Sequence, residues 1–249
     1  GDGFPDILAA RTLFLNKGGE GFVSAIDDLP EIWRTDWSGY VMSSLLEDFN
    51  GDGLADPLLF WGDEPDKNLK PRPPQIAISD TQTPSAEWQV HNLPTGPFGA
   101  GTTKFNHAAS ADIDNDGDMD IVIGTTRSAP YYVGRFLQVL VNDGSGHFDD
   151  ISEEALGEQP RALNHQDPNL QVECTVQGEG QVILLDIDND GDIDITDRTN
   201  GGKDGASDAC PGISIYLNNG NSIFMTDEKT QLASVRQNQI PGFVALSND

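Results

Sequence analysis

Apolar and polar residues alternate over short stretches of this chain, and three of these stretches resemble one another. In each, alternating apolar residues lead into a turn rich in Asn and Gly, and a Phe follows the turn. A period of two, interrupted by residues that tolerate positive φ, predicts a β-hairpin. The three segments are Leu13–Phe22 (LFLNKGGEGF), Val139–Phe148 (VLVNDGSGHF) and Ile215–Phe224 (IYLNNGNSIF).

Helical periodicity is not sustained anywhere along the sequence. Only Ile151–Leu156 and Glu228–Leu232 are expected to form a short turn of helix. The pattern therefore predicts an all-β fold, in which strands and tight turns alternate.

A second motif, D-x-[DN]-x-D-G-x-x-D, occurs three times without gaps. It reads DFNGDGLAD at Asp48–Asp56, DIDNDGDMD at Asp112–Asp120 and DIDNDGDID at Asp186–Asp194. The back half of a further copy, GDGFPD, occupies Gly1–Asp6. Each copy is followed by a short apolar run typical of a strand: Ile7–Ala10, Pro57–Trp61, Ile121–Gly124 and Ile195–Thr196.

The spacing of the motif indicates the size of the repeated unit. The first Asp of successive copies is separated by 112 − 48 = 64 and 186 − 112 = 74 residues. Such a unit suits a four-stranded sheet with one elaborated loop, and four-stranded units in tandem predict a β-propeller. We expect a single domain over residues 1–249, with approximate repeats 1–47, 48–111, 112–185 and 186–249.

The second repeat lacks a clear copy of the hairpin motif. Seven of the fifteen prolines of the chain lie between Pro65 and Pro97. We therefore expect residues 62–98 to form a long irregular insertion.

The acidic motif has the chemistry of a calcium loop. Gly at its sixth position permits the sharp bend, and hard carboxylate and carbonyl oxygens suit Ca²⁺, which accepts six to eight ligands at irregular angles. The predicted ligands are the side chains of Asp48, Asn50, Asp52 and Asp56 with the Leu54 carbonyl, those of Asp112, Asp114, Asp116 and Asp120 with the Asp118 carbonyl, and those of Asp186, Asp188, Asp190 and Asp194 with the Asp192 carbonyl.

Two other interpretations of these loops are disfavoured. An EF-hand needs a Glu at its twelfth position, where the loops have Leu59, Ile123 and Asp197. Solvated acidic turns would not explain three gapless copies at repeat spacing. Carboxylates this crowded repel one another by several kcal/mol, so a bound cation is expected to be structural and to contribute to folding.

At these residues the chain resembles the FG-GAP/VCBS repeat family, whose loops also occur in the propeller of integrin α subunits. The resemblance rests on the three acidic loops, the half copy at Gly1–Asp6 and the Asn/Gly turns before Phe. It implies propeller blades with Ca²⁺ in the loop between consecutive strands, in a secreted or cell-surface module for adhesion or carbohydrate binding. About four repeats are visible, which allows a complete ring or part of a larger propeller.

The two chain ends continue the motif when they are joined. Ser247–Asp249 followed by Gly1–Asp6 reads SNDGDGFPD. We expect either an excised portion of a longer array or ends that meet, within one ring or between neighbouring copies. A fourth calcium site containing Asp2 and Asp6 would then be shared between the ends.

The charge balance narrows the class of partner. With 14 basic and 41 acidic residues the net charge is 14 − 41 = −27, which disfavours nucleic acid and anionic membranes. No segment approaches the roughly 20 apolar residues of a membrane span. The expected partners are a protein or glycan on a cell surface or matrix, or further copies of the chain.

Few other residues suggest chemistry. Cys174 and Cys210 favour a disulfide, the alternative being two buried free thiols. Core packing or a place between blades is the favoured interpretation for every Trp, and Trp33 and Trp37, in the loop-like stretch PEIWRTDWSGY, are the better candidates for stacking on sugars. No nucleophile, phosphate-loop or HExxH motif is found.

Taken together, these observations favour a non-enzymatic extracellular module for adhesion or assembly. A lectin is the second expectation, and a polysaccharide-degrading enzyme is the least favoured.

Overall fold

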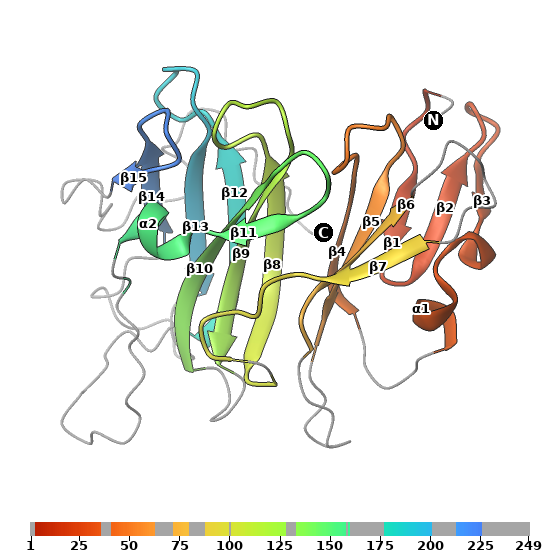
Figure 1. Cartoon of the computed structure of the whole chain (residues 1–249), viewed down its shortest axis with the longest axis horizontal. Coiled ribbons are helices and arrows are strands. Elements are labelled where there is room, and N and C mark those ends of the chain that lie inside the picture. The colour runs from red at the N-terminus through yellow and green to blue at the C-terminus, as the bar shows by residue number, and fades with distance from the viewer. Residues whose placement is uncertain are drawn as a thin grey trace, which may run out of the picture.

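The structure, a computed structural model, describes residues 3–35, 41–62, 72–79, 88–99, 101–127, 133–157, 159, 177–200 and 213–225. These residues form an all-β arrangement of four antiparallel sheets, each with its strands in chain order (Figure 1). Sheet 1 contains β1 (Ile7–Ala9), β2 (Thr12–Asn16) and β3 (Phe22–Ser24), and sheet 2 contains β4 (Val41–Glu47), β5 (Asp56–Trp61), β6 (Gln75–Ser79) and β7 (Trp88–Asn92). Sheet 3 contains β8 (Thr103–Ala111), β9 (Asp120–Arg127), β10 (Val133–Asn142) and β11 (Phe148–Asp150), and sheet 4 contains β12 (Gln177–Leu185), β13 (Asp194–Asn200), β14 (Ile213–Asn218) and β15 (Phe224–Met225).

Helical structure is limited to three short segments of the described chain. They are the 3₁₀ turn η1 (Ile26–Asp28), α1 (Glu31–Thr35) and α2 (Ser152–Leu156). Helix α2 lies where a short turn of helix was expected, α1 was not expected, and residues 228–232 lie outside the described residues. None of the described helices has the length and apolar character needed to cross a bilayer.

The predicted hairpins are confirmed. Strands β2 and β3 pair antiparallel, as do β10 and β11, and β14 and β15. Each acidic motif lies between the first two strands of its sheet, in sheets 2, 3 and 4.

The prediction of an irregular insertion over residues 62–98 is wrong. Strands β6 and β7 lie inside it and pair over five residues, from Gln75 opposite Asn92 to Ser79 opposite Trp88. Six of the seven prolines precede β6 or follow β7, and Pro84 lies between them in the sequence, so none interrupts the ladder hydrogen bonds of either strand.

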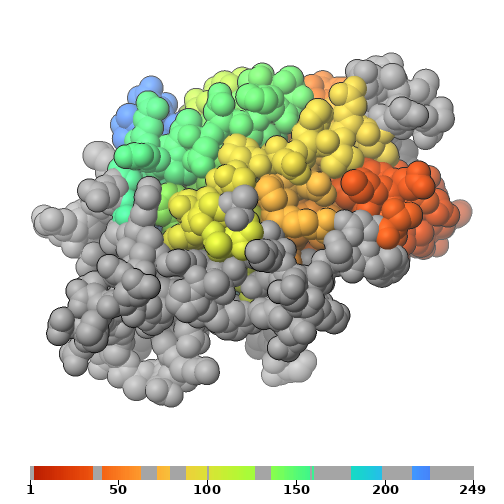
Figure 2. Space-filling view, turned by 60° about the horizontal axis from the view of Figure 1, so that its bottom comes forward, coloured from red at the N-terminus to blue at the C-terminus, as the bar shows by residue number. Residues whose placement is uncertain are grey.

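The sheets stand side by side in chain order, from sheet 1 at one end to sheet 4 at the other (Figure 1). The first strand of sheet 3, β8, packs against β4 of sheet 2 and β12 of sheet 4. The surface view shows the same succession, with sheet 1 in red beside the orange and yellow of sheet 2 and the green of sheet 3 further along (Figure 2).

The core is divided among the sheet-to-sheet contacts. Buried side chains of sheets 2 and 3 form one cluster, which includes Phe49, Phe60, Ile121 and Phe148. A second cluster joins sheet 3 to sheet 4, and a third joins sheet 1 to sheet 2 around α1. Adjacent sheets thus bury apolar faces against each other, which is how stacked repeats gain stability.

Candidate metal centres

The three acidic loops have the same backbone geometry. We name them loop A (Asp48–Asp56), loop B (Asp112–Asp120) and loop C (Asp186–Asp194), and number the positions of each from one to nine. The fourth and sixth positions have positive φ in all three, which Gly and Asn tolerate best. These residues are Gly51, Asn115 and Asn189 at position four, with φ of 71°, 62° and 63°, and Gly53, Gly117 and Gly191 at position six, with φ of 83°, 101° and 100°.

The same hydrogen bonds recur within the loops. The position-one carboxylate accepts the N–H of the position-six glycine, at 2.8 Å in loop A and 3.1 Å in loops B and C. The position-five carboxylate accepts the N–H of position seven in all three, at 2.8–3.0 Å. These local bonds turn the side chains of alternating positions toward the inside of the bend.

Carboxylate oxygens converge in loops B and C. One oxygen from each of Asp112, Asp114 and Asp116 lies within 4.8 Å of the others, and the same holds for Asp186, Asp188 and Asp194. Either group could hold a metal ion. Loop A has Asn50 at position three and Leu54 at position seven, so it has two carboxylates fewer than loop B or C and would carry less negative charge.

The electrostatics of the loops fit a cation. Burial raises the pKa of Asp114, and the neighbouring charges of Asp116 and Asp112 raise it further. Desolvation followed by the charges of Asp190 and Asp194 raises the pKa of Asp188. Both groups therefore hold a proton more readily than an isolated Asp, and a cation would favour their ionised form.

One buried oxygen supports the same conclusion independently of charge. The Oδ1 atom of Asp112 is buried and accepts no hydrogen bond, whereas its Oδ2 accepts the N–H of Gly117. An unpartnered buried carboxylate oxygen is costly. A metal ion bound by the loop would satisfy it, so the residues present fit an oxygen-ligated cation.

The position-nine carboxylate links the loop to the rest of its sheet. Asp120 is fully buried; its Oδ2 accepts the N–H of Ile113 at 2.8 Å, and its Oδ1 accepts the N–H of Asn142 at 2.9 Å. Asp194 accepts equivalent bonds from Ile187 and Asn218, both at 2.8 Å. In loop A, Asp56 accepts the N–H of Phe49 at 3.1 Å.

These bonds do not exclude metal ligation, because each carboxylate oxygen has a further lone pair. Asp194 lies in the carboxylate group of loop C. Burial raises the pKa of Asp120 to about 7, with the charges of Asp114 and Asp116 contributing and the two backbone hydrogen bonds opposing the shift.

The position-seven side chain contacts the hairpin turn of the same sheet. A Cβ placed on Gly144 would lie 2.3 Å from Asp118 Oδ2, and one on Gly220 would lie 2.8 Å from Asp192 Oδ2. With these side chains directed at the turns, the main-chain carbonyl at position seven stays the predicted ligand. Asp192 also accepts a bond from Asn115 Nδ2 at 2.9 Å, which connects loops B and C.

Two hairpin asparagines connect adjacent sheets, a role that the sequence pattern does not predict. Asn142 Nδ2 donates to the carbonyl of Phe49 at 2.7 Å, and Asn218 Nδ2 donates to that of Ile113 at 2.8 Å. Each bond joins a hairpin to position two of the loop on the preceding sheet. The signal in the sequence is the Asn that ends the apolar run in all three hairpin motifs, where the pattern by itself indicates only a turn residue.

Of the other site residues predicted from the sequence, only Asp6 and Trp33 lie within the described part of the chain. Asp6 accepts the N–H of Asn16 at 2.8 Å, the same role as Asp120 and Asp194 at position nine. Its proposed companion Asp2 lies outside the described residues. Trp37, Cys174 and Cys210 also lie outside the described residues. The glycan contact of Trp37 and the disulfide between Cys174 and Cys210 therefore stay predictions.

Trp33 packs in the core, as the favoured interpretation has it, and is not exposed for stacking on sugars. Its side chain is 1% exposed, and its Nε1 donates to Gln75 Oε1 at 3.1 Å. The same oxygen accepts the indole N–H of Trp61 at 3.2 Å. Helix α1 turns Trp33 inward to cover sheet 2, where it belongs to the buried cluster between sheets 1 and 2.

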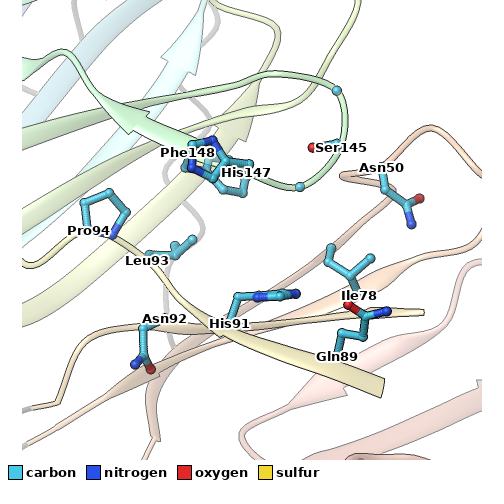
Figure 3. A pocket seen from close by; sticks show the side chains of 12 residues that line it. Asn50, Ile78, Gln89, His91, Asn92, Leu93, Pro94, Ser145, His147 and Phe148 are labelled. Carbon is cyan, nitrogen blue, oxygen red and sulfur yellow. The ribbon is translucent and has the colours of Figure 1, made fainter. Parts of the chain in front are cut away.

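A groove of about 740 Å³ lies between β7 and the turn that joins β10 to β11. Figure 3 shows His91 and Gln89 on the β7 side, facing Ser145 and His147 on the turn. Its lining therefore combines amide, imidazole and hydroxyl groups, which are hydrogen-bonding partners for a polar ligand.

Comparison with known proteins identifies no family for this chain. No protein-family model matches the chain, and a search of curated proteins finds no match. The resemblance to FG-GAP/VCBS repeats therefore depends on the acidic loops and hairpins alone.

Proposed function

We propose that this chain is a calcium-binding β-propeller scaffold, complete or part of a larger ring, that works outside the cell in adhesion, protein interaction or assembly. The observation that carries the proposal is the threefold repetition of one loop geometry, with three carboxylates brought together in loops B and C. Four sheets with their strands in chain order, standing side by side, support the propeller interpretation.

The donor set favours calcium over other cations. All candidate ligands are carboxylate, amide or carbonyl oxygens, which suit Ca²⁺, Mg²⁺ and Mn²⁺ and not metals that prefer nitrogen or sulfur. Mg²⁺ requires near-octahedral geometry and retains water, whereas Ca²⁺ tolerates the irregular angles of a short loop. Extracellular modules bind calcium at roughly 10⁻⁴–10⁻³ M, a range that oxygen-rich loops reach.

The position of the loops supports a structural role for the cation. Each loop joins the first two strands of a sheet, and its position-two carbonyl is held by an Asn of the next sheet in loops A and B. A cation that orders the loop therefore orders the contact between two sheets. Because the metal binds the folded state, its binding free energy adds to the free energy of unfolding.

Thermal unfolding of the intact chain, freed of metal and then supplied with Ca²⁺, tests this proposal. We expect a rise in melting temperature with Ca²⁺ that is reduced in Asp114→Asn and in Asp188→Asn. The matched control is Asp149→Asn, an exposed carboxylate of β11 outside the loops. If Ca²⁺ leaves the melting temperature of the wild type unchanged, or if the control responds as the loop variants do, the calcium proposal is wrong.

The groove beside β7 favours carbohydrate binding as a second candidate function. Its amide, imidazole and hydroxyl groups could bond to sugar hydroxyls. A glycan-array signal that is lost in His91→Ala and kept in Asp149→Asn would support it, whereas a signal insensitive to His91→Ala would exclude the groove as the site.

A further inference from the structure

The two contacts that surround sheet 3 are built from the same parts. Between sheets 2 and 3, Phe49 at position two of loop A packs edge-on against Phe148, with ring centroids 5.6 Å apart, and its carbonyl accepts the bond from Asn142. Between sheets 3 and 4, Ile113 at position two of loop B shares a buried cluster with Phe224, and its carbonyl accepts the bond from Asn218.

Each contact thus has two halves. The loop edge is the apolar residue at position two together with its carbonyl. The receiving face consists of the hairpin Asn, the hairpin Phe and the Ile that follows position nine on the next sheet. In the receiving faces of sheets 3 and 4, Phe148 is 4% exposed, Phe224 is 5% exposed, and Ile121 and Ile195 are fully buried.

Sheet 1 carries a third receiving face, and this one is open. Asn16, Phe22 and Ile7 occupy the equivalent positions, because Asn16 pairs with Phe22 as Asn142 pairs with Phe148. Phe22 is 50% exposed and Ile7 is 47% exposed. Asn16 Nδ2 donates to the position-eight carbonyl of Pro5 at 3.2 Å. Asn142 makes the equivalent bond in addition to its bond across to sheet 2.

Sheet 4 carries a third loop edge. Ile187 holds position two of loop C, and its N–H is held by Asp194 in the geometry seen in loop B. Ile187 is partly exposed, and Leu185, two residues before it, is 37% exposed. The residues at position two of the other loops are covered, since Phe49 is 1% exposed and Ile113 is fully buried. In the described part of the chain, no further sheet follows sheet 4.

These two open halves lie on different ends of the row of sheets, since sheets 1 and 4 are its first and last members (Figure 1). They are complementary in composition, because the contact between them would repeat a contact that the chain already makes twice. A surface of this kind joins one molecule to the next in a fixed direction.

We propose that a second copy of this chain binds head to tail, with its loop C edge docked on the Ile7, Asn16 and Phe22 face of sheet 1. Asn16 Nδ2 then donates to the Ile187 carbonyl of the neighbouring copy, and Phe22 covers the Ile187 side chain. The inference rests on the proposed scaffold function and specifies the assembly partner. At position seven, where loop C has Asp192, sheet 1 has Phe4, so the bond that Asn115 makes between loops B and C has no counterpart in the new contact.

The test uses two variants, each of which blocks one half of the contact. Phe22→Asp removes the receiving face, and Ile187→Asp removes the loop edge. Ile32→Asp is the matched control, since Ile32 is 52% exposed on α1 and belongs to neither half. The size of each intact chain is measured by analytical ultracentrifugation in Ca²⁺ over a range of concentrations.

We expect the wild type and the control to grow with concentration and each blocked variant to stay a monomer. An equimolar mixture of the two blocked variants should form a dimer that grows no further, because one competent half remains on each. A wild type that is monomeric at every concentration overturns the proposal, and so do blocked variants that grow like the wild type. If the wild type is monomeric and both blocked variants melt at lower temperature, the two faces are covered within a single chain.

The proposed calcium function is judged separately in the same samples. Phe22→Asp leaves the acidic loops unchanged, and Ile187→Asp changes only a loop side chain that is not a predicted ligand. A Ca²⁺-dependent rise in melting temperature in monomeric Phe22→Asp would uphold the calcium proposal even where assembly fails. Absence of that rise would contradict the calcium proposal and leave the assembly result to be judged by size alone.

Discussion

Truncation of Asn142 to Ala tests whether the hairpin asparagines hold adjacent sheets together. The Asn142 side chain is 2% exposed, and its Nδ2 donates to the Phe49 carbonyl at 2.7 Å and the Met119 carbonyl at 3.3 Å. Its Oδ1 accepts the N–H of Gly146 at 3.1 Å. The main-chain bond from Asn142 to Asp120 is retained in the variant.

The expected loss follows from the groups left without partners. Phe49 is 1% exposed, so its carbonyl would lose a bond in a site that water does not reach easily. A buried group left unsatisfied costs about 1–3 kcal/mol. With the weaker bonds to Met119 and Gly146 also lost, we expect Asn142→Ala to lower the free energy of unfolding by about 2–4 kcal/mol.

Asn16→Ala provides the matched control, because Asn16 holds the same place in sheet 1. Its side chain makes one exposed bond, to the carbonyl of Pro5, so its loss should cost no more than about 1 kcal/mol. Urea unfolding of both variants in saturating Ca²⁺, at a concentration where the chain is monomeric, gives the two values. Equal losses in the two variants, or a loss below about 0.5 kcal/mol in Asn142→Ala, would refute the inter-sheet role.

Two further predictions concern protonation and the buried tryptophan. The folded-state pKa of Asp120 is about 7 and exceeds its unfolded value, so the metal-free fold binds more protons than the unfolded chain between about pH 4 and 7. The contribution of Asp120 to stability should therefore fall as pH rises through that window. Thermal melts of the metal-free proteins should show a steeper fall in the wild type than in Asp120→Asn, in which the raised pKa values of Asp114 and Asp188 remain. Trp33→Ala should lower the free energy of unfolding by about 3–5 kcal/mol, whereas Ile32→Ala, its exposed neighbour on α1, should stay within about 0.5 kcal/mol of wild type in the same urea assay.

The local elements of this fold could be predicted from the sequence. The hairpins and acidic loops depend on contacts within a few residues, such as the bond from Asp112 to Gly117, so their patterns are visible in a short window. Strands β6 and β7 were not predicted because the nearby prolines indicated an irregular segment, and no Asn/Gly turn motif lies between the two strands.

Long-range contacts could not be predicted in the same way. The bonds from Asn142 to Phe49 and from Asn218 to Ile113 join residues 93 and 105 positions apart. The burial of Trp33 likewise depends on Gln75, 42 residues further along the chain. A sequence pattern shows that such residues recur, but only the packing of one sheet on another shows what they bind.

A crystal structure of the intact chain grown in Ca²⁺, with anomalous scattering used to locate the ions, would test whether the acidic loops bind calcium. We predict one ion in each of loops A, B and C, ligated by the side-chain oxygens of alternating loop positions and by the position-seven carbonyl. Well-ordered loops in saturating Ca²⁺ without an anomalous peak in any of them would show that these loops are not calcium sites.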